Sequence, residues 1–183
     1  MKKYFIYLSL VLLSININSQ ERDILYENDI KSFIKFQIID LEKSNVFIED
    51  SILSKIWGND QKLVDLFNPG QFSWVRNFGI KTKEDVIQFD NLFSEEEFAS
   101  MKKQIQNSKI KKWSELIDKK FFQSKEANIK NKYLSISIPV FNKDKNIAVI
   151  YFEFPNSGEL RIYKKEENKT WKYIANGLVW RAD

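Results

Sequence analysis

Hydrophobic and polar residues recur with two different periods along this chain, and the period changes near residue 133. Before that point, apolar residues return at close to helical spacing. Asn28 is a residue type that caps helices, and residues 28–42 carry one apolar stripe made of Ile30, Phe33, Ile34, Ile38 and Leu41. The looser alternation over residues 46–52 favours a short strand. The first third therefore predicts a helix over 28–42 followed by a strand.

The sequence around Ser94 carries the strongest helix signal. Ser94 and Glu97 have the spacing of a capping box, in which each side chain binds the other residue's amide. Phe93 and Phe98 are placed for the hydrophobic contact that often accompanies such a cap. Trp113, with the apolar residues after it, continues the helical spacing. We expect residues 94–120 to form a helix pair or a bent helix.

From residue 133 onward the period is two, which is typical of half-buried strands. Strands are predicted near residues 133–138, 147–154 and 160–162. Two further segments, residues 171–174 and 178–180, flank Asn176-Gly177, a dipeptide that favours a tight hairpin; the predicted turns include 142–145, 155–158 and 166–169. The predicted fold class is α+β, with N-terminal and central helices followed by a C-terminal antiparallel β-meander of four to five strands.

The first 20 residues have the pattern of an export signal. A basic start at Lys2 and Lys3 precedes an apolar run over residues 4–13 and a small, polar stretch over residues 14–19. The apolar run is shorter than the roughly 20 residues that span a bilayer, which disfavours the alternative of an uncleaved anchor. We expect a signal peptide over 1–19, a single α+β domain over 20–183, no stable membrane span after cleavage, and a periplasmic or secreted protein.

The residue types that are missing restrict the chemistry. The chain has neither Cys nor His. This excludes disulfides, thiol nucleophiles, Ser-His-Asp catalysis and the usual zinc ligand sets. An enzyme would have to use carboxylates, Lys, Tyr or Ser, so a non-enzymatic protein without cofactor or metal is the leading expectation, with no catalytic residue assigned.

Charge and aromatic content restrict the partners. The net charge is +4 and would fall by two units if Lys2 and Lys3 leave with the signal. A nearly neutral chain argues against nucleic acid, which needs an excess of basic side chains on one face. With 15 Phe, 7 Tyr and 5 Trp, the chain has ample aromatic surface to form a core.

One near-match to a calcium loop is rejected. Asn142, Asp144, Asn146 and Glu153 occupy four of its ligand positions, but Ile147 stands where the loop requires Gly. A polar hairpin turn accounts better for residues 142–146.

Four residues are candidates for a ligand-binding face. Glu153 interrupts an apolar strand, and Arg161 on the next predicted strand is a plausible partner across the hairpin. A solvent-facing or ion-paired Glu153 is the simpler interpretation, and a ligand face is the alternative. Trp74 and Arg76 could form an exposed patch for sugars or protein partners, although a buried Trp is the simpler interpretation.

Three local features carry a resemblance. They are residues 101–105 followed by Trp113, residues 137–144 leading into an apolar strand, and residues 164–166 leading to Trp171-Lys172. In these features, over roughly residues 94–180, the chain resembles small uncharacterised exported proteins of Bacteroidota. The resemblance implies fold and export and no catalytic residue. Relatives often carry a Gly- and Cys-rich loop where this chain has Pro155-Asn156-Ser157-Gly158.

The leading functional hypothesis is an exported binding or interaction protein whose partner is an envelope or secreted protein or a glycan. Two alternatives remain: a carboxylate-dependent hydrolase of an envelope glycan with Glu153 as its first candidate, and an inhibitor or immunity-type protein.

Overall fold

The computed structural model describes residues 26–38, 47–56, 62–68, 92–118, 122–123 and 133–182. The predicted export signal over residues 1–19 lies outside the described residues, as do Trp74 and Arg76.

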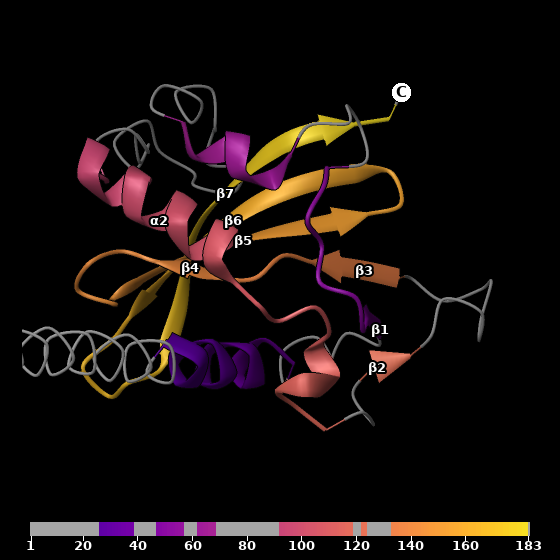
Figure 1. Cartoon of the computed structure of the whole chain (residues 1–183), viewed down its shortest axis with the longest axis horizontal. Helices are drawn as coiled ribbons and strands as arrows, with labels where there is room; N and C mark the ends of the chain where they lie inside the picture. The colour runs from indigo at the N-terminus through magenta and orange to yellow at the C-terminus, as the bar shows by residue number, and fades with distance from the viewer. Residues whose placement is uncertain are drawn as a thin grey trace, which may run out of the picture.

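The described strands form one mixed sheet in the order β2-β1-β3-β5-β6-β7, with β4 also paired to β5 (Figure 1). The central and C-terminal strands are antiparallel, whereas β1 is parallel to both of its neighbours. Together with the helices, this arrangement confirms the α+β class. The strands are β1 (Phe47–Glu49), β2 (Phe122–Gln123), β3 (Tyr133–Ile136), β4 (Val140–Phe141), β5 (Ile147–Phe154), β6 (Ser157–Lys165) and β7 (Trp171–Arg181).

Helical segments lie on both faces of the sheet, so the core has two halves. One face packs against a helix over residues 26–38 and the 3-10 turn η4 (Trp113–Glu115), and we call it the N-helix face. The other packs against η1 (Leu63–Phe67) and α2 (Glu95–Asn107), and we call it the α2 face. Figure 1 shows α2 and the indigo N-terminal helix on opposite sides of the strands.

The N-terminal helix begins earlier than predicted. It includes residue 26, so Asn28 lies inside the helix, and its assignment as the cap is wrong. The Tyr26 ring packs edge-on against Phe141, with 6.2 Å between ring centroids, and its hydroxyl donates to the carbonyl of Pro139 at 3.2 Å. These contacts hold the helix against the sheet at residue 26, and local sequence does not reveal them.

The cap of α2 is confirmed. The Glu97 amide donates to Oγ of Ser94 at 3.2 Å, and the Ser94 amide donates to Oε2 of Glu97 at 3.0 Å. Phe93 and Phe98 make the expected contact, with ring centroids 5.6 Å apart. The second helical segment is only the short turn η4, whose Trp113 amide donates to the Asp50 carbonyl at 2.8 Å.

The tight hairpin predicted at Asn176-Gly177 is wrong. β7 runs without a turn through both residues, with Asn176 opposite Arg161 and Gly177 opposite Leu160. Pairing with the nine residues of β6 outweighs the local turn preference, because each paired residue satisfies backbone groups. Register shifts in the β6–β7 pairing leave extra residues on β7, so the strand bulges instead of turning.

Candidate functional site

Glu153 is buried on the α2 face of the sheet. Only 4% of it is exposed, and its carboxylate accepts a hydrogen bond from the hydroxyl of Tyr151, two residues earlier on β5. Nε1 of Trp180 donates to the same hydroxyl oxygen at 3.0 Å. The expectation of a solvent-facing Glu153 is therefore wrong, and its burial is tolerated because the carboxylate is hydrogen-bonded.

Glu153 is part of a row of residues that runs across the sheet. Ser135 on β3 is directly opposite Glu153, and Oγ of Ser135 donates to Oε2 of Glu49 on β1 at 2.6 Å. On the other side, Glu153 is opposite Gly158 on β6, and Gly158 is opposite Trp180 on β7. We call these five residues the polar row.

Gly158 is required in the polar row because its neighbours occupy the space of a side chain. A β-carbon at this position would lie 2.5 Å from Nε1 of Trp180 and closer still to the hydroxyl oxygen of Tyr151. The missing side chain is what allows Trp180 and Tyr151 to meet over β6. The row thus contains two neighbouring hydrogen-bonded groups: Ser135 with Glu49, and Tyr151 with Glu153 and Trp180.

Tyr151 acts in this arrangement as a fixed hydrogen-bond donor. Burial raises the pKa of its hydroxyl well above the ordinary value, and the adjacent Glu153 carboxylate raises the pKa further. The hydroxyl therefore stays protonated at neutral pH and continues to donate to Glu153. This favours a structural role for Tyr151 and Glu153.

The predicted pair between Glu153 and Arg161 is wrong. Arg161 is opposite Ile150, so its side chain lies on the N-helix face, whereas Glu153 lies on the α2 face. Alternation along the strand separates them, because Glu153 and Ile150 are an odd number of residues apart. Arg161 instead forms an ion pair with Glu159, with Nη2 to Oε2 at 3.1 Å.

Arg161 is the centre of a half-exposed polar surface on the N-helix face. Its guanidinium carbon lies 4.3 Å from the ring centroid of Phe152 and 5.5 Å from that of Phe154. The two rings are themselves stacked at 6.4 Å. We call this surface the ledge; its residues are Phe154, Ser157, Glu159, Arg161, Asn176, Leu178 and Arg181.

Glu159 connects the side chains of the ledge. Its Oε2 accepts from Nε and Nη2 of Arg161 and, at 3.4 Å, from Nδ2 of Asn176. The side chains of Arg161 and Glu159 are 25% and 22% exposed, so solvent reaches a pair whose geometry is already fixed. The three polar side chains are therefore preorganised at the surface.

A hollow of about 280 Å³ opens beside the ledge. One hydrogen bond joins two segments at its rim: the Ala182 amide, just after β7, donates to the carbonyl of Asn156 in the β5–β6 turn at 2.9 Å. The lining combines hydrogen-bond donors and acceptors with one apolar side chain: Asn156, Ser157, Glu159, Asn176, Leu178 and Arg181. Arg161 does not line the hollow itself, but its two hydrogen bonds hold Glu159 in place.

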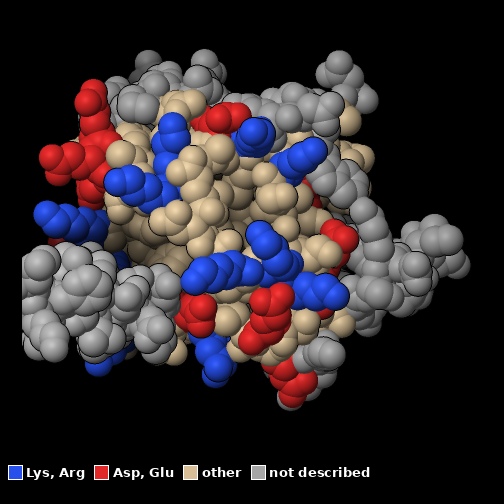
Figure 2. Space-filling view, viewed as in Figure 1, with Lys and Arg blue, Asp and Glu red and all other residues tan. Residues whose placement is uncertain are grey.

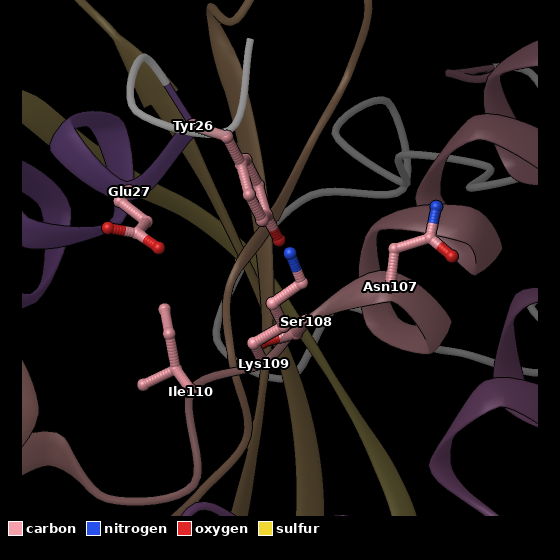
Figure 3. A pocket seen from close by; sticks show the side chains of 6 residues that line it. All are labelled: Tyr26, Glu27, Asn107, Ser108, Lys109 and Ile110. Atoms are coloured by element: carbon pink, nitrogen blue, oxygen red, sulfur yellow. The ribbon is translucent and has the colours of Figure 1, made fainter. Parts of the chain in front are cut away.

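The other hollows are less suited to a ligand. Figure 3 shows one where Tyr26 and Lys109 point toward each other, but it holds only about 60 Å³. Another, of about 690 Å³, lies at the β6–β7 turn, where the ion pair of Lys172 and Glu166 is 4.0 Å long and its side chains are 69% and 46% exposed. Exposed side chains of this kind are not held in place for a ligand.

A third hollow, of about 570 Å³, lies beside Phe141 and Asn142. Its amide side chains are already engaged. Gln104 donates to the carbonyl of Phe141 and accepts from its amide, and Oδ1 of Asn142 accepts from the amides of Asn146 and Ile147. Asn142 thus closes the polar turn that was expected in place of a calcium loop. Within the described ranges, no cluster of three or more acidic side chains could hold a metal ion.

On the face drawn in Figure 2, the coloured side chains form no patch of a single charge that would suggest another binding site. Among the coloured side chains, blue and red ones lie next to one another around a tan central area. This mixture agrees with the small net charge of the chain. Among the described helices, none combines the length and the apolar character needed to cross a bilayer.

Sequence reasoning found Arg161 but missed Glu159 and Asn176, which complete the ledge. Glu159 and Arg161 are two residues apart on β6 and so share a face. That spacing is a sequence signal from which Glu159 could be found. Asn176 gives no such signal, because Asn-Gly predicts a turn and not a strand. No family model, no curated protein and no solved structure matches the chain.

Proposed function

We propose that the chain is an exported, non-enzymatic binding protein of the cell envelope and that it binds its partner at the ledge. The observation that carries this proposal is the cluster of Arg161, Glu159 and Asn176, which is ordered by mutual hydrogen bonds yet open to solvent beside a hollow. Ordered polar groups bind with little further loss of side-chain entropy.

The export part of the proposal is supported by the sequence of residues 1–19 and by the resemblance to exported proteins of Bacteroidota. Export would bring the ledge into contact with envelope polysaccharides and envelope or secreted proteins. The inhibitor or immunity-type alternative would use the same ledge with a protein partner.

The hydrolase alternative receives less support. Glu49 and Glu153 lie in one row, but Ser135 separates them and binds Glu49, while Tyr151 binds Glu153. A glycosidase acid must reach the substrate oxygen, and Glu153 is 4% exposed. Its position favours a role in holding the strands together.

The proposal is tested by comparing how an immobilised wild-type protein and its Arg181→Ala and Asn176→Ala variants retain solubilised envelope components. We expect both variants to retain less of the bound fraction while unfolding at the wild-type temperature. The matched control is Lys111→Ala, which removes an exposed cation away from the ledge. Equal retention by the wild type and both ledge variants would refute the proposal.

A further inference from the structure

The hollow beside the ledge presents one carboxylate and one guanidinium to the same small space. Glu159 and Arg181 both line it, together with the amides of Asn156 and Asn176 and the hydroxyl of Ser157. A ligand here must therefore both donate and accept hydrogen bonds within about 280 Å³.

The charge of Glu159 is already compensated inside the protein. Arg161 donates twice to its Oε2 and lies over the Phe152 ring, so the carboxylate attracts a further cation only weakly. Among the described residues, all three hydrogen bonds to this carboxylate end on Oε2, so Oε1 can accept from a ligand. This combination favours an uncharged donor over an ammonium group.

Neutral hydroxyl groups meet these requirements. Each hydroxyl both donates and accepts, so neighbouring hydroxyls on a sugar ring can donate to Glu159 and accept from Arg181 or an amide. Leu178 offers an apolar surface for the C–H groups of such a ring. An anionic group could accept from Arg181, but it has no donor for the Glu159 carboxylate, which only accepts.

From this arrangement, which rests on the proposed function, we infer that the ligand of the ledge is a neutral carbohydrate. Glu159 accepts from its hydroxyls, Arg181 donates to them, and Arg161 is a positioning residue that fixes Glu159. An amino-terminal peptide, which would need an unpaired carboxylate for its ammonium group, is the competing ligand.

The test uses an array of neutral oligosaccharides, built from hexoses, deoxyhexoses and N-acetylhexosamines, alongside dipeptides and acidic sugars. We expect the wild-type protein to bind neutral oligosaccharides and the Glu159→Gln variant to bind them roughly tenfold more weakly, because a hydrogen bond to a charged group is lost. Glu167→Gln removes the same charge from an exposed position outside this hollow and should bind as the wild type does.

A second variant separates positioning from direct contact. Arg161→Lys keeps the positive charge but cannot form the planar double contact with Glu159. We expect weaker binding of every oligosaccharide that the wild type binds, with unchanged preference among them, whereas Arg181→Ala should change the preference.

The outcomes distinguish the two proposals. Binding of dipeptides or acidic sugars that is lost in Glu159→Gln would overturn the carbohydrate assignment and leave the binding function at the ledge intact. Oligosaccharide binding that Glu159→Gln and Arg181→Ala leave unchanged would overturn the assignment as well. The wild-type protein could also bind none of the arrayed ligands and still retain an envelope fraction that the ledge variants do not retain. That result would overturn the carbohydrate assignment and leave the proposed binding function intact.

Discussion

Arg161 donates two hydrogen bonds to one oxygen of Glu159, the residue that precedes it by two positions on β6. The contact holds a carboxylate at the edge of a hollow and stacks a guanidinium on Phe152. Side chains two apart on a strand share a face, so the strand itself brings these groups together. The ledge is therefore built on the sheet and not on a loop.

Removing the Tyr151 hydroxyl should destabilise the protein. In Tyr151→Phe, Glu153 loses the hydroxyl that donates to it and Trp180 loses its acceptor. Removing one partner of a buried hydrogen bond costs about 1–3 kcal/mol, so we expect the two losses together to lower the free energy of unfolding, measured with urea, by about 2 kcal/mol or more. Tyr173→Phe is the matched control, because Tyr173 is 45% exposed and should change stability by less than about 0.5 kcal/mol. Equal effects of the two substitutions would contradict the structural role of the Tyr151 hydroxyl, which binds Glu153 and Trp180.

Adding one methyl group at Gly158 should also be destabilising. The new β-carbon would overlap Tyr151 and Trp180, and overpacking of this kind costs about 1–3 kcal/mol or more. Urea unfolding of Gly158→Ala, Tyr151→Phe and the double variant measures the coupling between the two positions. Because Tyr151→Phe removes the closest atom, Gly158→Ala should cost less in that background. Additive effects would show that the two residues do not meet.

The cap of α2 gives a local prediction. Ser94→Ala removes the acceptor for the Glu97 amide and should lower the free energy of unfolding by about 0.5–2 kcal/mol. Ser100→Ala changes the same residue type at an exposed position inside α2 and should be neutral or slightly stabilising. A Ser94→Ala variant as stable as the wild type in urea would show that the cap contributes nothing.

Stability should fall in alkaline solution. Burial raises the pKa of Tyr26 above its ordinary value of about 10. A raised pKa means that the folded state keeps its proton where the unfolded state loses it, so the stabilisation is complete below about pH 10 and is lost as the pH rises toward the folded-state pKa. The free energy of unfolding, followed from neutral to alkaline pH, should therefore decline above about pH 10, and less steeply in Tyr26→Phe. The same slope in both proteins would contradict the assignment.

The capping box of α2 was predicted correctly from the sequence, whereas contacts between elements were not. Ser94 and Glu97 are three residues apart, and their capping box follows from spacing alone. Tyr26, which lies in the N-terminal helix ahead of the predicted start at residue 28, contacts Pro139 and Phe141, more than 100 residues away. Such contacts leave no periodic signal in the chain.

In the candidate site, too, local sequence predicted some features, and the pairing of strands decided the others. Arg161 was identified from its place on a predicted strand, but its partner depends on which face it occupies, and that depends on the register of the β5–β6 pairing. Asn176 was assigned to a hairpin because Asn-Gly favours turns, yet the long pairing of β6 with β7 keeps it in a strand. The residues that complete the ledge become apparent only once the strands are paired.

The most direct test of the account is a titration of the isotope-labelled protein with the envelope fraction that it retains, followed by amide chemical shifts. We expect the largest changes at Glu159, Asn176 and Arg181, and no saturable change in the double variant Glu159→Gln/Arg181→Ala at the same concentrations. Saturable changes that map elsewhere and persist in the double variant would contradict the ledge as the binding surface.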